Sequence, residues 1–247
     1  MSGHSKFHNI AKRKGANDAK RAKIFTKIGR ELAIAIKEGG SANPDNNSRL
    51  RDVVAKAKAN NMPNDNIKRT LDKYSGAAGS VDFEANNYEG YGVAGVAVVV
   101  ETLTDNKNRT VADVRHLFDK YGAGLGASGC VSWQFDKKGV ILIERGDLDE
   151  DTVMMQALEA GAEDFQANED TFEIYTAPEE FSVVREALET LGYSFAEAEI
   201  EMVPQNYITI ESTDDMAKMR KLLDNLEDND DVQAVWHNWE NEDDYEG

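Results

Sequence analysis

The side chains best placed to act on a partner are the lysines and arginines near the start of the chain. Residues 1–80 contain 17 Lys and Arg against 7 Asp and Glu, a local net charge of +10, whereas residues 81–247 contain 11 against 39, a net charge of −28. Cationic side chains that neutralise phosphates supply much of the affinity of proteins for nucleic acids. The charge partition therefore predicts that residues 1–80 contact a polyanion and that the acidic remainder does not.

Nine of these cations form the candidate nucleic-acid-binding set. Part of the set lies in an extended basic arm and part on one face of a predicted helix, and together they could follow a phosphate backbone without reading bases. A solvated basic surface with no partner is the alternative interpretation. The candidate residues are Lys6, Lys12, Arg13, Lys14, Lys20, Arg21, Lys23, Lys27 and Arg30.

The sequence shows no set of residues that matches a known catalytic or metal-binding pattern. His4 and His8 have no third ligand nearby, and Cys130 is the single cysteine, without a C-x-x-C partner. No nucleophile elbow, Walker lysine or Ser/His/Asp set is present. We therefore predict a non-enzymatic protein with no cofactor and no metal site. The lone cysteine excludes an intrachain disulfide and favours a reducing cytoplasm.

The expected partner is nucleic acid, either DNA or ribosomal RNA, bound through residues 1–80. The ribosome itself is a further candidate. No segment approaches the ~18 apolar residues that a membrane span requires, so no membrane partner is expected. We expect the protein to act as a monomer in the cytoplasm.

Two loops could carry chemistry of their own. Residues 124–129 match G-x-G-x-x-G, but a dinucleotide site needs a strand before the motif and a helix after it. Here a helix is predicted before it and a strand after it, so a mobile glycine-rich loop that could approach RNA is the better interpretation. Residues 104–110 form a polar loop, explained either by turn chemistry and capping or by a recognition role for Lys107 and Arg109.

Helical periodicity dominates the first 80 residues. Helices are predicted from Asn17 to Glu38, from the Asn46–Ser48 cap region to about Asn60, and after Pro63. In the first helix the apolar side chains occupy one arc of about 120°, with Ile34 alone among the basic residues. The inter-helix segments are judged longer than the turn of a helix-turn-helix motif, which argues against that motif.

Strands and helices alternate beyond a linker at residues 75–80. Residues 139–144, 164–167, 171–176 and 194–203 are predicted strands, with helices over 149–160 and from Pro178 onward. This order is the ferredoxin-like βαββαβ arrangement.

The flanking segments predict a second unit of the same kind. Strands at 96–103, 130–135, 207–211 and 232–236 accompany helices at 110–121, with Thr110 at its cap, and 213–226. A lone βαβ half cannot bury its sheet, so the two halves are expected to pair.

The predicted class is therefore α+β: an N-terminal three-helix domain followed by two ferredoxin-like βαββαβ domains, one inserted in the other. The expected domains are residues 1–80, residues 81–136 plus 204–247, and residues 137–203.

Several longer motifs follow one another along the chain: Met1–Phe7, Asn9-Ile10, Arg13-Lys14, Lys23–Lys27, Asn60–Pro63 with Asp65–Ile67, Tyr88–Gly92 and Leu103–Thr110. Together they resemble the YebC/PmpR family, whose relatives include the mitochondrial translational activator of cytochrome oxidase. The resemblance covers nearly the whole chain. Departures are Phe7 where the family usually has Trp, Val93 where Pro is common, and Cys130 where Ser is common.

The resemblance implies a cytoplasmic, non-enzymatic regulator of gene expression with three domains, the first of them helical. Some members are described as DNA-binding transcriptional regulators. Others are described as ribosome-associated translation factors that relieve stalled synthesis. The resemblance does not choose between DNA and ribosomal RNA as the ligand.

Overall fold

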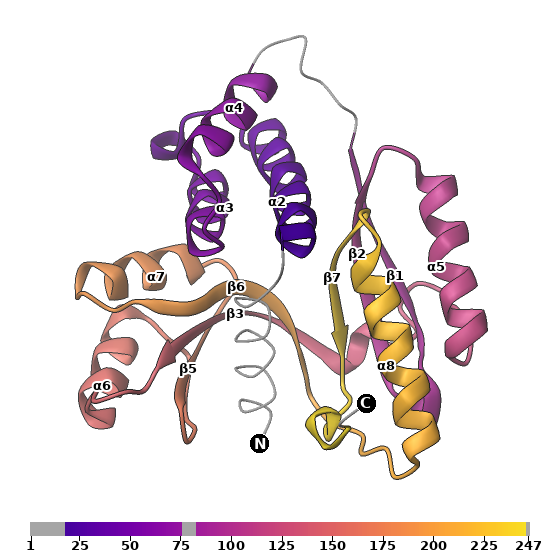
Figure 1. Cartoon of the computed structure of the whole chain (residues 1–247). Coiled ribbons are helices and arrows are strands. Elements are labelled where there is room, and N and C mark those ends of the chain that lie inside the picture. The colour runs from indigo at the N-terminus through magenta and orange to yellow at the C-terminus, as the bar shows by residue number, and fades with distance from the viewer. Residues whose placement is uncertain (1–17, 76–82, 246–247) are drawn as a thin grey trace. The chain divides into compact units, whose positions relative to one another are not determined.

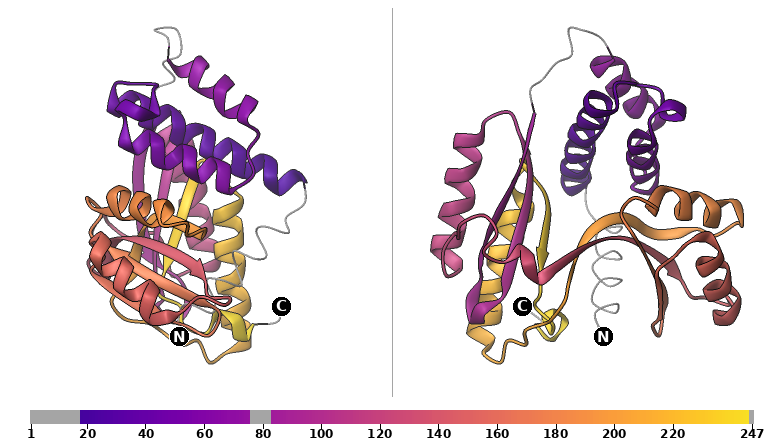
Figure 2. Two further views of the ribbon diagram at one scale, coloured as in Figure 1. Left: turned by 90° about the vertical axis from the view of Figure 1, so that its left-hand side faces the viewer. Right: turned by 180° about the vertical axis from the view of Figure 1, so that it is seen from behind.

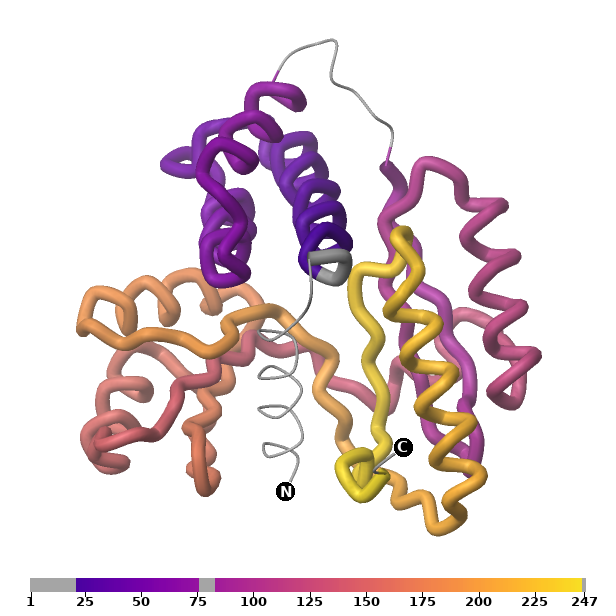
Figure 3. The backbone as a smooth tube through the Cα atoms, viewed as in Figure 1, coloured from indigo at the N-terminus to yellow at the C-terminus, as the bar shows by residue number. Residues whose placement is uncertain are grey.

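The computed structural model describes residues 18–75 and 83–245 (Figure 1). The chain forms two compact units. Unit 1 combines Met1–Gly79 with Lys137–Glu201, and unit 2 combines Ser80–Asp136 with Met202–Gly247. Each unit is thus built from segments far apart in the sequence, as the colours of the backbone tube in Figure 3 make visible. The three-domain division stays a prediction beside this two-unit grouping.

Unit 1 begins with the helical segment, residues 18–75. It contains α2 (Asp18–Gly39), η1 (Pro44–Asn46), α3 (Ser48–Ala59) and α4 (Asn64–Tyr74). Ile28, Leu32 and Leu50 are at most 1 % exposed and form the centre of its core. Asn47 begins α3 by accepting a hydrogen bond from the Leu50 N–H, while its amide donates to the carbonyls of Ala35 and Ser41. The three predicted helices are therefore present.

The connection between α3 and α4 corrects one prediction. It spans only Asn60–Pro63, with Asn61 in the left-handed region at φ 57°. Asparagine adopts this conformation more readily than most residues and so allows a sharp turn. The connection therefore has the length of a helix-turn-helix turn, and the judgement that it is too long for that motif is wrong.

The inserted part of unit 1 has ferredoxin-like topology. Its elements are β3 (Phe135–Glu144), α6 (Glu150–Ala160), β4 (Asp164–Ala167), β5 (Thr171–Thr176), α7 (Phe181–Thr190) and β6 (Phe195–Pro204). The strand order is β4-β5-β3-β6, and β5 runs antiparallel to both β3 and β4. The predicted βαββαβ order is confirmed, although α7 begins at Phe181 because Pro178 lies in a turn.

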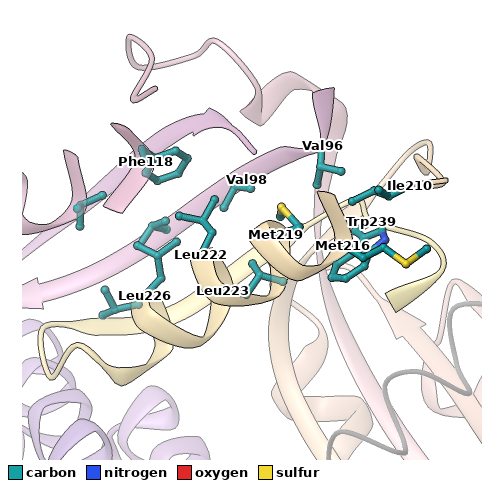
Figure 4. Packing of buried hydrophobic residues seen from close by; sticks show 13 residues of the cluster. Val96, Val98, Phe118, Ile210, Met216, Met219, Leu222, Leu223, Leu226 and Trp239 are labelled. Carbon is teal, nitrogen blue, oxygen red and sulfur yellow. The ribbon is translucent and has the colours of Figure 1, made fainter. Parts of the chain in front are cut away.

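Unit 2 contains a three-stranded antiparallel sheet in the order β1-β2-β7, which Figure 2 shows from two further sides. Its elements are β1 (Glu84–Tyr91), η2 (Val93–Gly95), β2 (Ala97–Thr104), α5 (Lys107–Tyr121), η3 (Ser132–Gln134), α8 (Thr213–Asp228), β7 (Val232–His237) and η4 (Glu242–Asp244). Helices α5 and α8 cover one face of this sheet. Between them they bury Phe118, Met219 and Leu222 against Val98 and its neighbours (Figure 4).

The α+β class is confirmed, with N-terminal helices followed by two sheet-containing regions, but the strands of unit 2 differ from the prediction. The expected strands at 130–135 and 207–211 are wrong: the first is a turn leading into η3, and Ile208 in the second makes only an isolated bridge to Trp239. The sheet instead uses β1, which the sequence did not predict. That strand is polar, with half of its residues exposed, and its extended form depends on its pairing with β2 from Glu84↔Thr104 to Tyr91↔Ala97.

Candidate nucleic-acid interface

Helix α2 separates an apolar face from a basic one. Ile28 and Leu32 are buried in the core of the helical segment, with Phe25 half-buried beside them. Among the candidate cations, Arg21 is exposed and Lys23, Lys27 and Arg30 are half-buried, and each of the four interacts with other residues. Ile34, the apolar residue on the basic side, is only 4 % exposed. The basic face is therefore part of a packed surface and not a row of free side chains.

The remaining candidates are not described in full. Lys20 belongs to α2 by its backbone, and nothing is described of its side chain. Four others lie outside the described residues, and their expected role stays a prediction: Lys6, Lys12, Arg13 and Lys14.

Two cations of α3 are committed to ion pairs within unit 1. Lys56 Nζ lies 3.0 Å from Glu31 Oε1 and 2.9 Å from Glu199 Oε2. Burial alone would lower the pKa of Lys56, but the two carboxylates outweigh that effect and raise it. Arg51 Nη1 lies 2.6 Å from Glu186 Oε1. These two side chains hold α3 to the inserted segment and are poor candidates for binding phosphate.

Exposed cations on α3 and α4 extend the candidate surface beyond the predicted set. Lys58 lies near the end of α3, and Lys68, Arg69 and Lys73 lie along α4, all exposed. Reasoning from the sequence did not select them, because their helices show no basic stripe as regular as that of α2. Their exposure, once the helices are placed, is the signal that identifies them.

The polar loop before α5 is organised around Asp231, whose side chain is 5 % exposed. Its Oδ2 accepts hydrogen bonds from Thr104 Oγ1 at 3.2 Å and Thr110 Oγ1 at 2.8 Å, and it pairs with Arg109 Nη2 at 2.8 Å. Asn106 caps α5 by accepting from the Arg109 N–H. Thr110 is buried inside the helix, so its predicted capping role is wrong.

The contacts of this loop confirm the interpretation of turn chemistry and capping. Arg109 also pairs with Asp105 at 2.9 Å. The charge of Arg109 is therefore balanced by two carboxylates, Asp105 in the loop and Asp231 just before β7. Lys107, which is also exposed, is the other cation of the recognition alternative.

The glycine-rich loop of residues 122–130 packs against β1 and has no nucleotide-binding geometry. A Cβ on Gly126 would lie 2.3 Å from Cys130 Sγ and 3.2 Å from the Glu89 carbonyl oxygen, so a larger residue there would require the Cys130 side chain and the nearby backbone to shift. Gly129 has φ +86°, which also favours glycine. Helix α5 precedes the motif, and η3, a single 3-10 turn, follows it. The glycines thus serve close packing and turns, consistent with the rejection of a dinucleotide site.

Comparison with known proteins identifies the family. Residues 5–77 match the model of the TACO1/YebC protein N-terminal domain, and residues 83–239 match the TACO1/YebC second and third domain. The chain belongs to the TACO1/YebC family. This finding confirms the resemblance to YebC/PmpR proteins that the sequence motifs indicated.

Relatives and a solved structure agree with this membership. A protein of Acetivibrio thermocellus is 58 % identical over 240 residues, covering 97 % of this chain and 99 % of the relative. One of Clostridium tetani is 58 % identical over 248 residues, covering all of both chains. Both are named "Probable transcriptional regulatory protein". The crystal structure of the conserved hypothetical protein Aq1575 from Aquifex aeolicus matches with a TM-score of 0.80 and 44 % identity, over 90 % of this chain and 91 % of that one.

The names of these two relatives describe transcriptional regulatory proteins. Over residues 18–75 and 83–245, no group of three or more His, Cys, Asp or Glu side chains could hold a metal ion. In the same part of the chain, no helix is long and apolar enough to cross a membrane.

Proposed function

We propose that this protein regulates gene expression by binding nucleic acid through its basic N-terminal part, acting as a DNA-binding transcriptional regulator. The observation that carries the proposal is the charge partition of +10 in residues 1–80 against −28 in residues 81–247. With 17 cations and 7 acids, the N-terminal part cannot balance its own charge internally. A phosphate backbone is the commonest polyanion that would balance it.

The binding surface we propose combines the basic face of α2 with the arm that precedes it. Exposed Lys68, Arg69 and Lys73 on α4 add positive charge beside a turn of helix-turn-helix length, which favours duplex DNA. Backbone contacts of this kind set position and not sequence, so we expect binding that tolerates many sequences. Arg51 and Lys56 take no part, because carboxylates of unit 1 already neutralise them.

A second candidate function is that of a ribosome-associated translation factor that binds ribosomal RNA. It is favoured by the spread of exposed cations beyond the basic face of α2, since Lys58 on α3 and Lys68, Arg69 and Lys73 on α4 are also exposed. Structured RNA is recognised mostly by shape and by backbone contacts, which suits such a dispersed surface.

Sedimentation of lysates through sucrose separates the two candidates. A DNA-binding regulator should stay off the ribosomal fractions at physiological salt, and the purified chain should bind a 30-base-pair duplex more tightly than a ribosomal RNA hairpin of equal length. A ribosome-binding factor should travel with ribosomes at low salt and leave them at high salt. A chain that binds neither duplex, hairpin nor ribosome at low salt would contradict both.

A further inference from the structure

Unit 2 displays a tryptophan at its surface. Of the three tryptophans in the chain, Trp239 is 3 % exposed and Trp236 is half-buried, whereas Trp133 is 65 % exposed. Large aromatic side chains normally bury most of their area, and an exposed indole costs solubility without adding to the core. Trp133 therefore needs an explanation other than folding.

A hydrogen bond fixes the nitrogen edge of the Trp133 indole. Its Nε1–H donates to the carbonyl oxygen of Cys130 at 3.1 Å. The phenol of Tyr91, which is 37 % exposed, donates to the same oxygen at 3.4 Å. Because the only donor of the indole is already used, what Trp133 offers to a partner is the face of its ring.

Hydrogen bonds fix the backbone around Trp133. The carboxylate of Glu89, 5 % exposed, accepts hydrogen bonds from the N–H groups of Gly129 at 2.8 Å, Val131 at 3.0 Å and Ser132 at 2.8 Å. On the other side, the Gln134 carbonyl accepts from the Gln205 N–H at 2.8 Å. An aromatic ring on such a support loses little freedom when a ligand stacks on it, which favours binding.

The loop that precedes Trp133 carries small, exposed side chains. Residues 126–129, Gly-Ala-Ser-Gly, are all exposed and carry the smallest side chains. We call Trp133, Tyr91 and residues 126–129 the aromatic platform. It presents no charged side chain of its own, so it suits a ligand group that is planar and uncharged.

We propose that the aromatic platform binds an unpaired nucleobase, which stacks on the face of Trp133. The inference rests on the proposed function, because a chain that does not bind nucleic acid has no base to offer. Every base has a π-face, so stacking tolerates sequence, as does the backbone binding proposed for the helical segment. The acidic surroundings of unit 2 disfavour phosphate but not a neutral base, so the platform adds to affinity that the N-terminal cations supply. A base in a closed duplex cannot reach it.

The test compares the full-length chain with Trp133→Ala and Trp133→Phe, using three probes: 12-nucleotide oligouridine, the matching oligodeoxyuridine and a 12-base-pair duplex. Stacking on an aromatic side chain is worth ~1–3 kcal/mol per base. Trp133→Ala should therefore weaken binding of one or both single strands by about fivefold or more and leave duplex binding within twofold. Trp133→Phe should keep most of the affinity. A loss with oligouridine alone assigns the base to RNA, and an equal loss with both assigns it to either nucleic acid.

A matched control and a spectroscopic readout sharpen the result. Met155→Ala removes an apolar side chain that is 56 % exposed in unit 1 and should change no affinity. Single strands should quench tryptophan fluorescence in the wild type and not in Trp133→Phe. Thermal unfolding should be unchanged in both Trp133 variants.

The outcomes separate this inference from the proposed function. A wild type that binds no probe overturns both. A wild type that binds all probes, with Trp133→Ala binding single strands equally well, overturns the platform alone. Normal oligonucleotide binding by Trp133→Ala with a loss of ribosome co-sedimentation would also overturn base stacking and assign Trp133 to a protein contact.

Discussion

The helical segment and the loop before α5 both contain cations next to polar side chains, yet their charges are arranged in opposite ways. In the loop, Arg109 meets Asp231 and Asp105, and the hydroxyls of Thr104 and Thr110 point at the same carboxylate. The helical segment belongs to a region with ten more cations than acids. A cation that pairs with a carboxylate stabilises the fold, whereas cations in excess over carboxylates can bind a phosphate backbone.

The same distinction holds within the helical segment. Lys56 is held by two carboxylates, while Lys58, two residues further on, is exposed. Residue type therefore does not assign a role, because neighbouring lysines of one helix serve different purposes. The following changes test this difference, beginning with the largest expected effect.

Reversing two charges on α2 should weaken nucleic-acid binding most. For Lys23→Glu combined with Lys27→Glu we expect a loss on the order of a hundredfold at low salt, because two attractions to phosphate become repulsions. The plot of log K against log salt should also become shallower by about 2 on duplex DNA. Fluorescence anisotropy with labelled DNA and RNA measures both, and circular dichroism checks the fold.

The matched control for that pair is Lys218→Glu combined with Lys221→Glu on α8. It changes the net charge equally, at two exposed positions of unit 2. An equal loss of affinity in the control would mean that net charge alone governs binding, and the comparison between the two regions would not hold.

Removing the carboxylate of Asp231 should destabilise the protein without changing its affinity for nucleic acid. Asp231→Ala leaves the buried hydroxyls of Thr104 and Thr110 without this acceptor, which should cost about 2 kcal/mol of unfolding free energy. Urea denaturation measures it. Asp105→Ala, which removes the exposed partner of Arg109, should cost less than about 1 kcal/mol. Weaker nucleic-acid binding by folded Asp231→Ala would argue that the loop has a recognition role after all.

Neighbouring lysines on α3 provide a smaller test of the same kind. Lys56→Ala removes charged hydrogen bonds to Glu31 and Glu199 and should cost about 1.5 kcal/mol. Lys58→Ala should stay within about 0.5 kcal/mol, as exposed substitutions usually do. Nucleic-acid affinity should change in the opposite order: Lys58→Ala should bind more weakly than Lys56→Ala. The same rank order in stability and in binding would contradict the division of roles.

The smallest effect concerns Glu89 beneath the aromatic platform. Burial alone would raise the pKa of Glu89, but the three N–H donors outweigh it and hold the pKa below its ordinary value. A carboxyl with a depressed folded pKa stabilises the protein above the unfolded pKa of about 4.3, and this contribution disappears as the pH falls through the lower folded value. Glu89→Gln should thus cost about 1 kcal/mol at pH 7 and progressively less below about pH 4. A difference that persists unchanged under acid conditions would contradict the ionic nature of this anchor.

Periodicity was enough to predict most elements of this fold. Ile28 and Leu32 lie at helical spacing and are buried, and the ferredoxin-like order of β3, α6, β4, β5, α7 and β6 follows from alternating strand and helix patterns. Strand β1 could not be found this way, because Glu84–Tyr91 shows no apolar alternation and depends on hydrogen bonds to β2. Conversely, Ile208 and Ile210 alternate like a strand, yet Ile210 is buried without strand partners.

The candidate site was predictable only in part. Charge counting selected the N-terminal region, because an imbalance of charge is a property of composition and does not depend on the fold. It could not tell Lys56 from Lys58, since the carboxylate of Glu199 lies 143 positions along the chain from Lys56 and 2.9 Å away in space. Nor could it select Trp133, whose exposure depends on the anchored turn after the glycine-rich loop. Three-dimensional contacts decide both cases.

The salt dependence of binding by the full-length chain tests the central claim most directly. Affinity for duplex DNA and for single strands would be measured from low to physiological salt and plotted as log K against log salt. If the N-terminal cations make about six phosphate contacts, the slopes should be about −5 on duplex DNA and about −4 on single strands. A slope near zero on both would show that the excess positive charge of residues 1–80 is only a solvated surface.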